Sequence, residues 1–228
     1  MRKIITIDGP AGSGKSTVAL HLARCLGVGL LDTGAMYRAV TLAAVREEVD
    51  FDDAGALANL ARQCHIELGL RENADQVRLN GEDVTEAIRT PEITRLAYKI
   101  AQVESVREIL VEQQRQIAAQ ADGLVTEGRD QGTVAFSGAD IKFYLDATPS
   151  CRARRRWRQY QEAKTKANLS YEEVLSAQQQ RDQRDAGRSI SPLKVPQGAI
   201  IVDTTEMTIE EVVEKLYRYV KEYFRTFS

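Results

Sequence analysis

The sequence has few of the residues that build disulfide scaffolds, zinc sites and histidine-dependent hydrolases. Among 228 residues there are three cysteines and two histidines. Cys25, Cys64 and Cys151 are odd in number, widely spaced and without a C-x-x-C pair, so they predict neither a disulfide framework nor a metal site. His21 and His65 lie far apart and have no third partner, which argues against a Ser-His-Asp triad or a histidine-rich zinc site. We interpret all five as packing or surface residues.

Long apolar runs and a strong excess of one charge are also missing. The longest apolar stretches have about four or five residues, whereas a membrane-spanning helix needs about 18. Lys plus Arg number 31 and Asp plus Glu 33, a formal net charge of −2, while a nucleic-acid-binding chain is usually strongly basic. Asp8 interrupts the apolar start that a signal peptide would need. We therefore expect a cytoplasmic monomer that binds neither membrane nor nucleic acid.

What is present is an ordinary globular balance, with 43% apolar and 28% charged residues, arranged as alternating strands and helices. Apolar patterning predicts strands at 3–8, 28–31, 123–127, 140–146 and 199–203. Helices are predicted at 15–26, 35–46, 54–62, 91–103, 105–120, 150–163, 171–187 and from Thr208 onward. Short strands separated by helices predict an α/β fold with a five-stranded parallel sheet and right-handed crossovers.

Smaller signals refine this expectation. Residues 65–70 and 76–80 alternate apolar and polar side chains, with ENAD between them, and predict an antiparallel hairpin inserted into the α/β order. Gly27 is a candidate left-handed cap for the first helix. The sequence from Thr208 to Glu211 has the T-x-x-E form of a capping box, which predicts a helix start there.

A glycine-rich segment follows the first predicted strand. Residues 9–16 read GPAGSGKS and match G-x-x-x-x-G-K-[ST] in full. Glycines let the backbone curl so that its N–H groups face phosphate oxygens, and the following helix adds positive partial charge. The lysine of such a loop reaches the β and γ phosphates, and the hydroxyl residue ligates Mg²⁺. We predict a nucleoside triphosphate site formed by Gly9, Pro10, Ala11, Gly12, Ser13, Gly14, Lys15, Ser16 and Thr17, with Ser16 on the metal.

The arginines indicate what happens to the γ phosphate. A GTPase switch would need an Asn-Lys-x-Asp base reader, and the sequence has none. A small-molecule kinase needs cations around a second phosphate, and eight of the 22 arginines lie between 152 and 188. On a helix, Arg181, Arg184, Asp185 and Arg188 would share one stripe. Like charges on one stripe favour a bound polyanion, although a solvated charged face is the alternative.

Several ordered motifs give the chain a resemblance to bacterial-type cytidylate kinases over nearly its whole length. They are IDGPAGSGKST at 7–17, LDTGAMYRA at 31–39, EGRDQGT at 127–133, RDQRDAGR at 181–188, SPLK at 191–194 and IVDTTEMTIEEVV at 201–213. The resemblance implies direct in-line transfer of the γ phosphoryl group of ATP to CMP or dCMP, with Mg²⁺ as cofactor. Another small-molecule or nucleoside monophosphate kinase, or a non-catalytic ATP-binding regulator, is the alternative.

The resemblance also implies an architecture. It is a three-layer P-loop NTPase core with a five-stranded parallel sheet, a monophosphate-binding insertion containing a small antiparallel sheet, and a helical lid. We expect one kinase domain over 1–228. Its core would take about 1–33, 105–148 and 188–228, the monophosphate-binding part about 34–104 and the lid about 149–170.

Individual roles are implied by the same resemblance. Lys15, Arg129 and Arg181 would be catalytic, and Arg155 would contact the ATP donor. Separately from the resemblance, the position of Asp32 at the end of the second predicted strand suggests that it orients Mg²⁺ through water. The CMP acceptor would be bound by Thr33, Arg38, Tyr98, Arg107, Arg129, Asp130, Arg181, Asp185 and Arg188.

Selection of the base rests on two of these positions. Asp130 only accepts hydrogen bonds, so it suits the amino group of cytosine and would oppose O4 of uracil. Tyr98 stands where the family usually has a base-contacting serine. Its phenol could bond the base, it could pack inward, or Thr94 could replace it one turn earlier.

Overall fold

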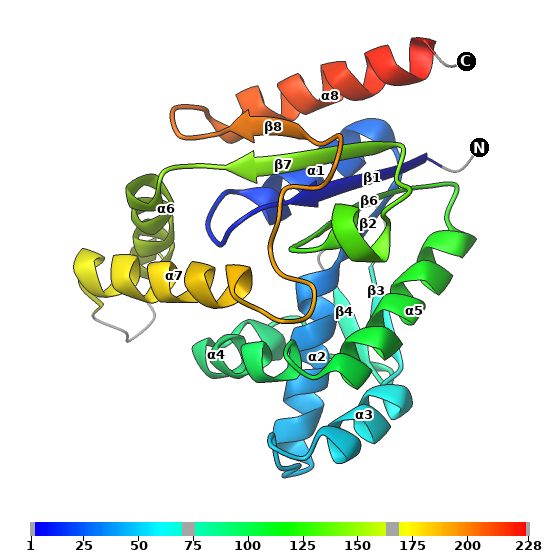
Figure 1. Ribbon diagram of the computed structural model, residues 1–228, viewed down its shortest axis with the longest axis vertical. Coiled ribbons are helices and arrows are strands. Elements are labelled where there is room, and N and C mark those ends of the chain that lie inside the picture. The colour runs from blue at the N-terminus through cyan, green and yellow to red at the C-terminus, as the bar shows by residue number, and fades with distance from the viewer. Residues whose placement is uncertain (1–2, 70–75, 163–168, 227–228) are drawn as a thin grey trace. The chain divides into compact units, whose positions relative to one another are not determined.

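A computed structural model of the chain describes residues 3–69, 76–162 and 169–226 (Figure 1). Its backbone contacts divide the chain into two units. Unit 1 comprises Met1–Ile4 and Ala23–Glu127, and unit 2 comprises Ile5–Leu22 and Gly128–Ser228. This division differs from the core, insertion and lid expected above, which stay a prediction.

The central element is a five-stranded sheet of order β2-β6-β1-β7-β8. Its strands are β1 (Lys3–Asp8), β2 (Gly29–Asp32), β6 (Gly123–Gly128), β7 (Ile141–Asp146) and β8 (Ile200–Asp203). The pairs β2–β6, β1–β7 and β7–β8 are parallel. All six residues of β6 are buried, as expected for a parallel strand covered on both faces. The predicted parallel sheet is confirmed.

The helices between β2 and β6 belong to unit 1. They are α2 (Thr33–Arg46), α3 (Ala54–Gln63), α4 (Pro91–Ile100) and α5 (Glu104–Gln120), with the short turn η2 (Ala87–Arg89). The buried face of α2 is rich in alanine, including Ala35 and Ala39, which lets neighbouring backbones approach closely. The chain here packs α2 against α4 and α3 against α5.

A small second sheet also lies in unit 1. Strands β3 (Ile66–Leu68) and β4 (Val77–Leu79) pair antiparallel, which confirms the predicted hairpin. The ENAD turn between them lies outside the described residues. A third strand, β5 (Glu82–Asp83), pairs with β4; it was not predicted because two residues show no periodicity.

Unit 2 carries most of α1 (Lys15–Leu26), then α6 (Pro149–Glu162), α7 (Tyr171–Ala186) and α8 (Ile209–Thr226). Helices α6 and α7 pack together, and α8 contacts β7. The rings of Phe143 on β7 and Tyr219 on α8 lie 6.2 Å apart. After β6, residues Gln131–Ala135 form a π-helical turn, η3.

Helix ends follow the predicted signals, with two corrections. Gly27 has φ +68° and ends α1 as expected, and Thr208 and Glu211 exchange the two hydrogen bonds of a capping box. Helix α2 begins at Thr33 instead of residue 35, because the Asp32 carboxylate accepts a hydrogen bond from the Ala35 amide and caps it there. Helix α4 ends at Ile100, three residues before its expected end.

Within the described ranges, no helix is both long enough and apolar enough to cross a membrane.

Candidate active site

The phosphate-binding loop connects β1 to α1, as its sequence pattern requires. Gly9 has φ +149°, and a Cβ atom at this position would lie 2.0 Å from the Leu145 carbonyl oxygen of β7. Only glycine allows this approach, because any side chain would overlap the neighbouring strand. The loop therefore passes close to the end of β7 and leads into the N-terminus of α1, and the N-terminus of a helix favours anions.

Lys15 is the buried cation of this loop, with 5% of its surface exposed. Its ammonium group donates hydrogen bonds to the Pro10 carbonyl (2.7 Å) and to Ser13 Oγ (3.4 Å). Ser13 Oγ itself donates to the Pro10 carbonyl. Burial of a charge is tolerable only with such partners. A phosphate group that enters the loop would offer Lys15 stronger, charged acceptors in their place.

The residues present suit a metal that arrives with the nucleotide. The described part of the chain has no group of three or more His, Cys, Asp or Glu that could hold an ion. Ser16, in the first turn of α1, is exposed. Mg²⁺ commonly takes one or two protein oxygens and completes its shell with phosphates and water, so a single hydroxyl at the loop fits it.

A carboxylate at the end of β1 ties the loop of Arg129 and Asp130 to this strand. Asp8 is fully buried, and its two oxygens accept the amides of Gln131 (2.9 Å) and Gly132 (2.7 Å). Burial raises the pKa of Asp8 to about 6. The two amides and Lys15 lower it in part, and the nearby charge of Asp130 raises it further. Sequence reasoning missed this residue as part of the site.

The titration of Asp8 predicts how an Asp8→Asn variant changes stability with pH. Because the folded pKa lies above the unfolded value, protonation of Asp8 stabilises the fold; this contribution is complete below about pH 4 and is lost as pH rises through 6. Relative to the variant, the wild type should gain up to about 3 kcal/mol between pH 7 and pH 4. Chemical denaturation at several pH values measures this difference.

A matched control is available on the same strand. Thr6 is also fully buried, and its hydroxyl has no hydrogen-bond partner within the described residues. A Thr6→Val variant should therefore differ from the wild type by an amount that does not change with pH. A pH-independent difference for Asp8→Asn as well would show that the carboxylate does not titrate as described.

Asp185 accepts hydrogen bonds from two of the arginines predicted to bind the acceptor. Arg129 Nε donates to Asp185 Oδ2 at 2.9 Å, and Arg188 donates to Oδ1. The Asp185 side chain is 4% exposed. Burial alone would raise the pKa of Asp185, but the guanidinium groups of Arg129, Arg188 and Arg181 hold it below its usual value. We call Arg129, Asp185 and Arg188 the arginine cluster.

The predicted stripe on α7 is only partly right. Helix α7 ends at Ala186, so Arg188 reaches Asp185 from beyond the helix end. Arg184 is exposed and donates to the Gln180 carbonyl of its own helix. It therefore does not belong to the arginine cluster. Arg181 is exposed, and its charge acts on Asp185.

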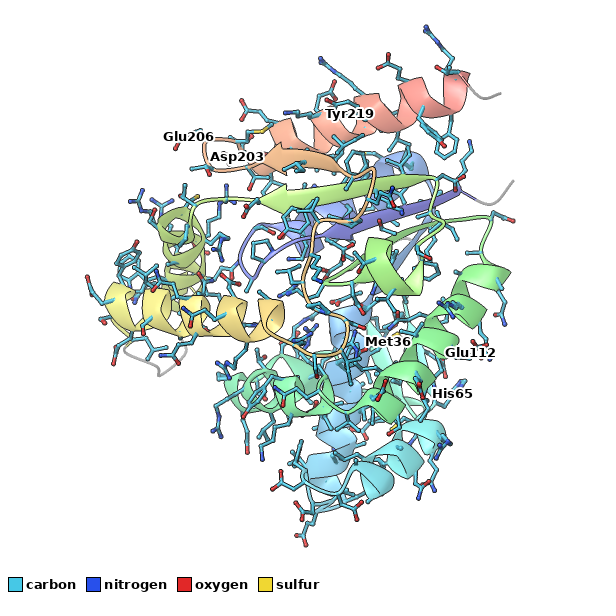
Figure 2. The ribbon with its side chains drawn as sticks, viewed as in Figure 1. Met36, His65, Glu112, Asp203, Glu206 and Tyr219 are labelled. Carbon is cyan, nitrogen blue, oxygen red and sulfur yellow. The ribbon has the colours of Figure 1, made fainter. Side chains whose placement is uncertain are left out.

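Arg155 of α6 docks on the loop that follows β8. Its guanidinium donates to Thr204 Oγ1 (3.0 Å) and to the carbonyls of Thr204 and Met207. Thr204 Oγ1 also lies 3.3 Å from the Ser13 carbonyl of the phosphate-binding loop. Asp203 and Glu206, labelled in Figure 2, flank Thr204 and mark this loop at the end of β8. The expected donor-side arginine therefore lies in one network with the phosphate-binding loop.

In unit 1, the predicted site residues at the end of β2 and on α2 have hydrogen-bond partners within the protein. Asp32 caps α2 with one oxygen, and its other oxygen pairs with Arg38 at 3.1 Å. The Thr33 hydroxyl donates to the Glu127 carbonyl at 2.7 Å. Both Asp32 oxygens thus have protein partners, and its role toward Mg²⁺ stays a prediction. The buried Arg38 Nε has no partner among the described residues.

Arg107 and Tyr98 are the other predicted residues of unit 1. Arg107 on α5 is 4% exposed, donates to the Ala101 carbonyl (3.2 Å) and lies over the Tyr37 ring, 5.5 Å from its centroid. Tyr98 is a partly exposed residue of α4. Their roles toward a nucleotide base stay predictions.

Unit 2 thus brings together the phosphate-binding loop, Asp130, Arg155 and the arginine cluster, whereas the predicted residues Asp32, Thr33, Arg38, Tyr98 and Arg107 belong to unit 1. Sequence reasoning missed Asp8, Arg152, Asp182 and Thr204. A polar residue at the carboxyl end of a parallel strand was the available signal for Asp8. Arg152 was visible only as one of the five arginines between 152 and 158.

Comparison with known proteins shows the family of the chain. A family model described as cytidylate kinase matches residues 5–222. A cytidylate kinase of Caldanaerobacter subterraneus subsp. tengcongensis is 48% identical over 218 residues, which are 95% of this chain and 94% of that one. Another from Solibacter usitatus is 45% identical over 223 residues, 96% and 93% of the two chains. The fold is shared with an uncharacterized protein from Eubacterium ventriosum, at a TM-score of 0.50, 13% identity and coverage of 96% and 99%. The phosphate-binding loop, the ordered motifs and these similarities agree, and the chain belongs to the cytidylate kinase family.

Proposed function

We propose that this protein transfers the γ phosphoryl group of ATP to CMP or dCMP, forming ADP and the cytidine diphosphate. Family membership supports the reaction. The observation that carries it is the presence, within unit 2, of a complete phosphate-binding loop and a second group of cations organised by Asp185. A protein that only bound ATP would not need the second group.

On the donor side, the loop amides and Lys15 bind the β and γ phosphates. Lys15 exchanges its bonds to Pro10 and Ser13 for phosphate oxygens. Ser16 is the residue that would hold Mg²⁺, which supplies positive charge to the phosphates when bound. Arg155, fixed on Thr204, lies on the donor side of the same network.

On the acceptor side, Arg38, Arg129 and Arg181 hold the CMP phosphate, and Arg188, Asp185, Thr33 and Arg107 complete the acceptor contacts. No strong general base is required, because a phosphate oxygen of CMP is already a nucleophile. The transition state carries charge on the transferring oxygens, so positioned cations account for most of the catalysis. A monomeric state and a cytoplasmic location stay predictions.

An acceptor panel tests the proposal. Release of ADP from ATP and Mg²⁺ would be followed by a coupled assay with CMP, dCMP, UMP, AMP, GMP or no acceptor at equal concentrations. Release confined to CMP and dCMP supports the proposal and shows that Tyr98 is compatible with cytosine. Release confined to another monophosphate would overturn the cytidine assignment and direct attention to Tyr98, while acceptor-independent release would overturn the kinase itself.

Selection of cytosine predicts the behaviour of an Asp130→Asn variant. Asp130 is 5% exposed, and Gln131 Nε2 lies 3.4 Å from its Oδ1. An amide presents a donor to O4 of uracil and so removes the discrimination against it. We expect kcat/KM for CMP to fall about 100-fold, the CMP:UMP ratio to fall with it, and the KM for ATP to change little.

Steady-state kinetics with both acceptors measure this ratio. Asp122→Asn, a change at an exposed position before β6, serves as the control and should leave the ratio as in the wild type. If Asp130→Asn keeps the wild-type CMP:UMP ratio, Asp130 does not read the base.

A further inference from the structure

A partly buried ion pair between α6 and α7 contacts the phosphate-binding loop. Arg152 of α6 is 5% exposed, and its Nη1 lies 2.5 Å from Asp182 Oδ2 of α7. The same Nη1 donates to the Ala11 carbonyl at 3.0 Å, and Arg152 Nε donates to the Ala147 carbonyl at 2.9 Å. Asp182 Oδ1 accepts the Ala11 amide at 3.3 Å. The pair thus engages both the N–H and the C=O of Ala11.

Packing beside this contact is equally tight. A Cβ atom at Gly12 would lie 2.8 Å from Gln178 Nε2 of α7 and 3.1 Å from the Arg152 carbonyl and Cβ of α6. Gln178 is 8% exposed. The next residue of the loop after Ala11 is therefore enclosed by the same two helices, and these helices cannot move away from the loop without breaking the Arg152–Asp182 contacts.

One face of α7 connects this contact to the arginine cluster. Gln178, Asp182 and Asp185 follow at intervals of four and three residues, which place them along one face of a helix. Asp182 and Asp185 are separated by about one turn, a rise of about 4.5 Å. Asp182, which contacts the phosphate-binding loop, and Asp185, which contacts the arginines of the cluster, therefore lie on successive turns of one helix.

We propose that Arg152 and Asp182 are positioning residues that hold Ala11 by both its backbone groups and so fix the register between the phosphate-binding loop and the arginine cluster. The inference rests on the proposed function, since that register sets the distance between the γ phosphate and the acceptor phosphate. Neither residue touches the reacting atoms in this account. A misplacement of about 1 Å between reacting groups is enough to cost about 100-fold in rate.

The test compares Arg152→Met, Asp182→Asn and the double variant, with Arg154→Met as the matched control at an exposed position of the same helix. Steady-state kinetics with ATP and CMP give kcat and both KM values, and thermal unfolding gives the melting temperature. Each single variant should lose between about 10-fold and 100-fold in kcat, with both KM values within about threefold of the wild type. The control should match the wild type in all four quantities.

The double variant separates positioning from stability. Each single change removes one partner of this partly buried ion pair and should lower the melting temperature, whereas removing both charges should recover part of the loss. Because the two side chains hold the same loop residue, Ala11, kcat of the double variant should be no lower than that of the less active single variant, yet it should not return to the wild-type value. Recovery of kcat together with the melting temperature would show that the pair is only structural.

Other outcomes would also overturn the proposal. If the loss of kcat in the double variant equals the product of the losses in the two single variants, the residues act independently. If the variants change only the KM values, the residues affect binding instead of register. If the wild type forms no CMP-dependent ADP, the proposed function fails and this inference falls with it. A wild type that is active with CMP, beside variants that keep its kcat, would overturn the inference alone.

Discussion

A Lys15→Met variant is expected to lose about 10³-fold or more in kcat while keeping its fold. Charge develops on the transferring oxygens in the transition state, and removal of one preorganised donor of this kind costs about 10²- to 10³-fold. Lys15 is also a charged donor, so the larger figure applies. Methionine keeps the length of the chain in a position that is 5% exposed and removes the need to satisfy a buried ammonium group.

The measurement is kcat for CMP-dependent ADP formation, with the melting temperature recorded alongside. Lys215→Met, at an exposed position on α8, provides the control for loss of one positive charge and should retain wild-type kinetics. A Lys15→Met variant with a melting temperature near that of the wild type and more than a tenth of its kcat would contradict the role assigned to Lys15.

Replacement of Asp185 by alanine is expected to affect both stability and acceptor use. The carboxylate is the shared partner of Arg129 and Arg188, and Arg181 also acts on it. Removing this buried carboxylate deprives two partly buried guanidinium groups of their shared partner, and breaking a buried ion pair in this way typically costs about 3–5 kcal/mol of unfolding free energy. The released arginines would no longer be oriented toward the acceptor, so kcat/KM for CMP should fall at least about 100-fold.

The Asp185→Asn variant refines this expectation, since it keeps the shape and removes the charge. Because the folded pKa of Asp185 is depressed, its stabilising contribution is present above the unfolded value near pH 4 and is lost as pH falls through the folded pKa. The wild type should therefore exceed Asp185→Asn in stability at pH 7 and approach it in acid.

Denaturant unfolding at pH 7 and in acid measures the free energy of unfolding of each variant. Steady-state kinetics with CMP measure kcat/KM. Glu172→Ala removes an exposed carboxylate from the same helix and should change neither quantity appreciably. If Asp185→Ala matches the Glu172→Ala control in stability, the arginine cluster is not held by this carboxylate.

Local patterns explain why much of the fold was predictable. The phosphate-binding loop is a contiguous eight-residue pattern between a strand and a helix, so the sequence alone located it. The Thr208–Glu211 capping box is equally local, and its two hydrogen bonds appear where predicted. The predicted limits of β1 and α1 match the observed ones.

Tertiary contacts explain what was missed. Asp8 bonds amides 123 and 124 positions away, and no periodicity signals such a contact. The helical stripe included Arg188, but α7 ends at Ala186, so Arg188 reaches Asp185 from beyond the helix end. Asp182 and Asp185 look alike in the sequence, yet one holds the phosphate-binding loop and the other holds Arg129 and Arg188.

The most direct test of the central claim follows the phosphoryl group itself. ATP labelled at the γ phosphate would be incubated with the protein, Mg²⁺ and CMP, and the products separated, with Lys15→Met as the blank. The account predicts that the label moves to the terminal phosphate of CDP, in amounts equal to the ADP formed. Label found as inorganic phosphate in the same amount with and without CMP would contradict it.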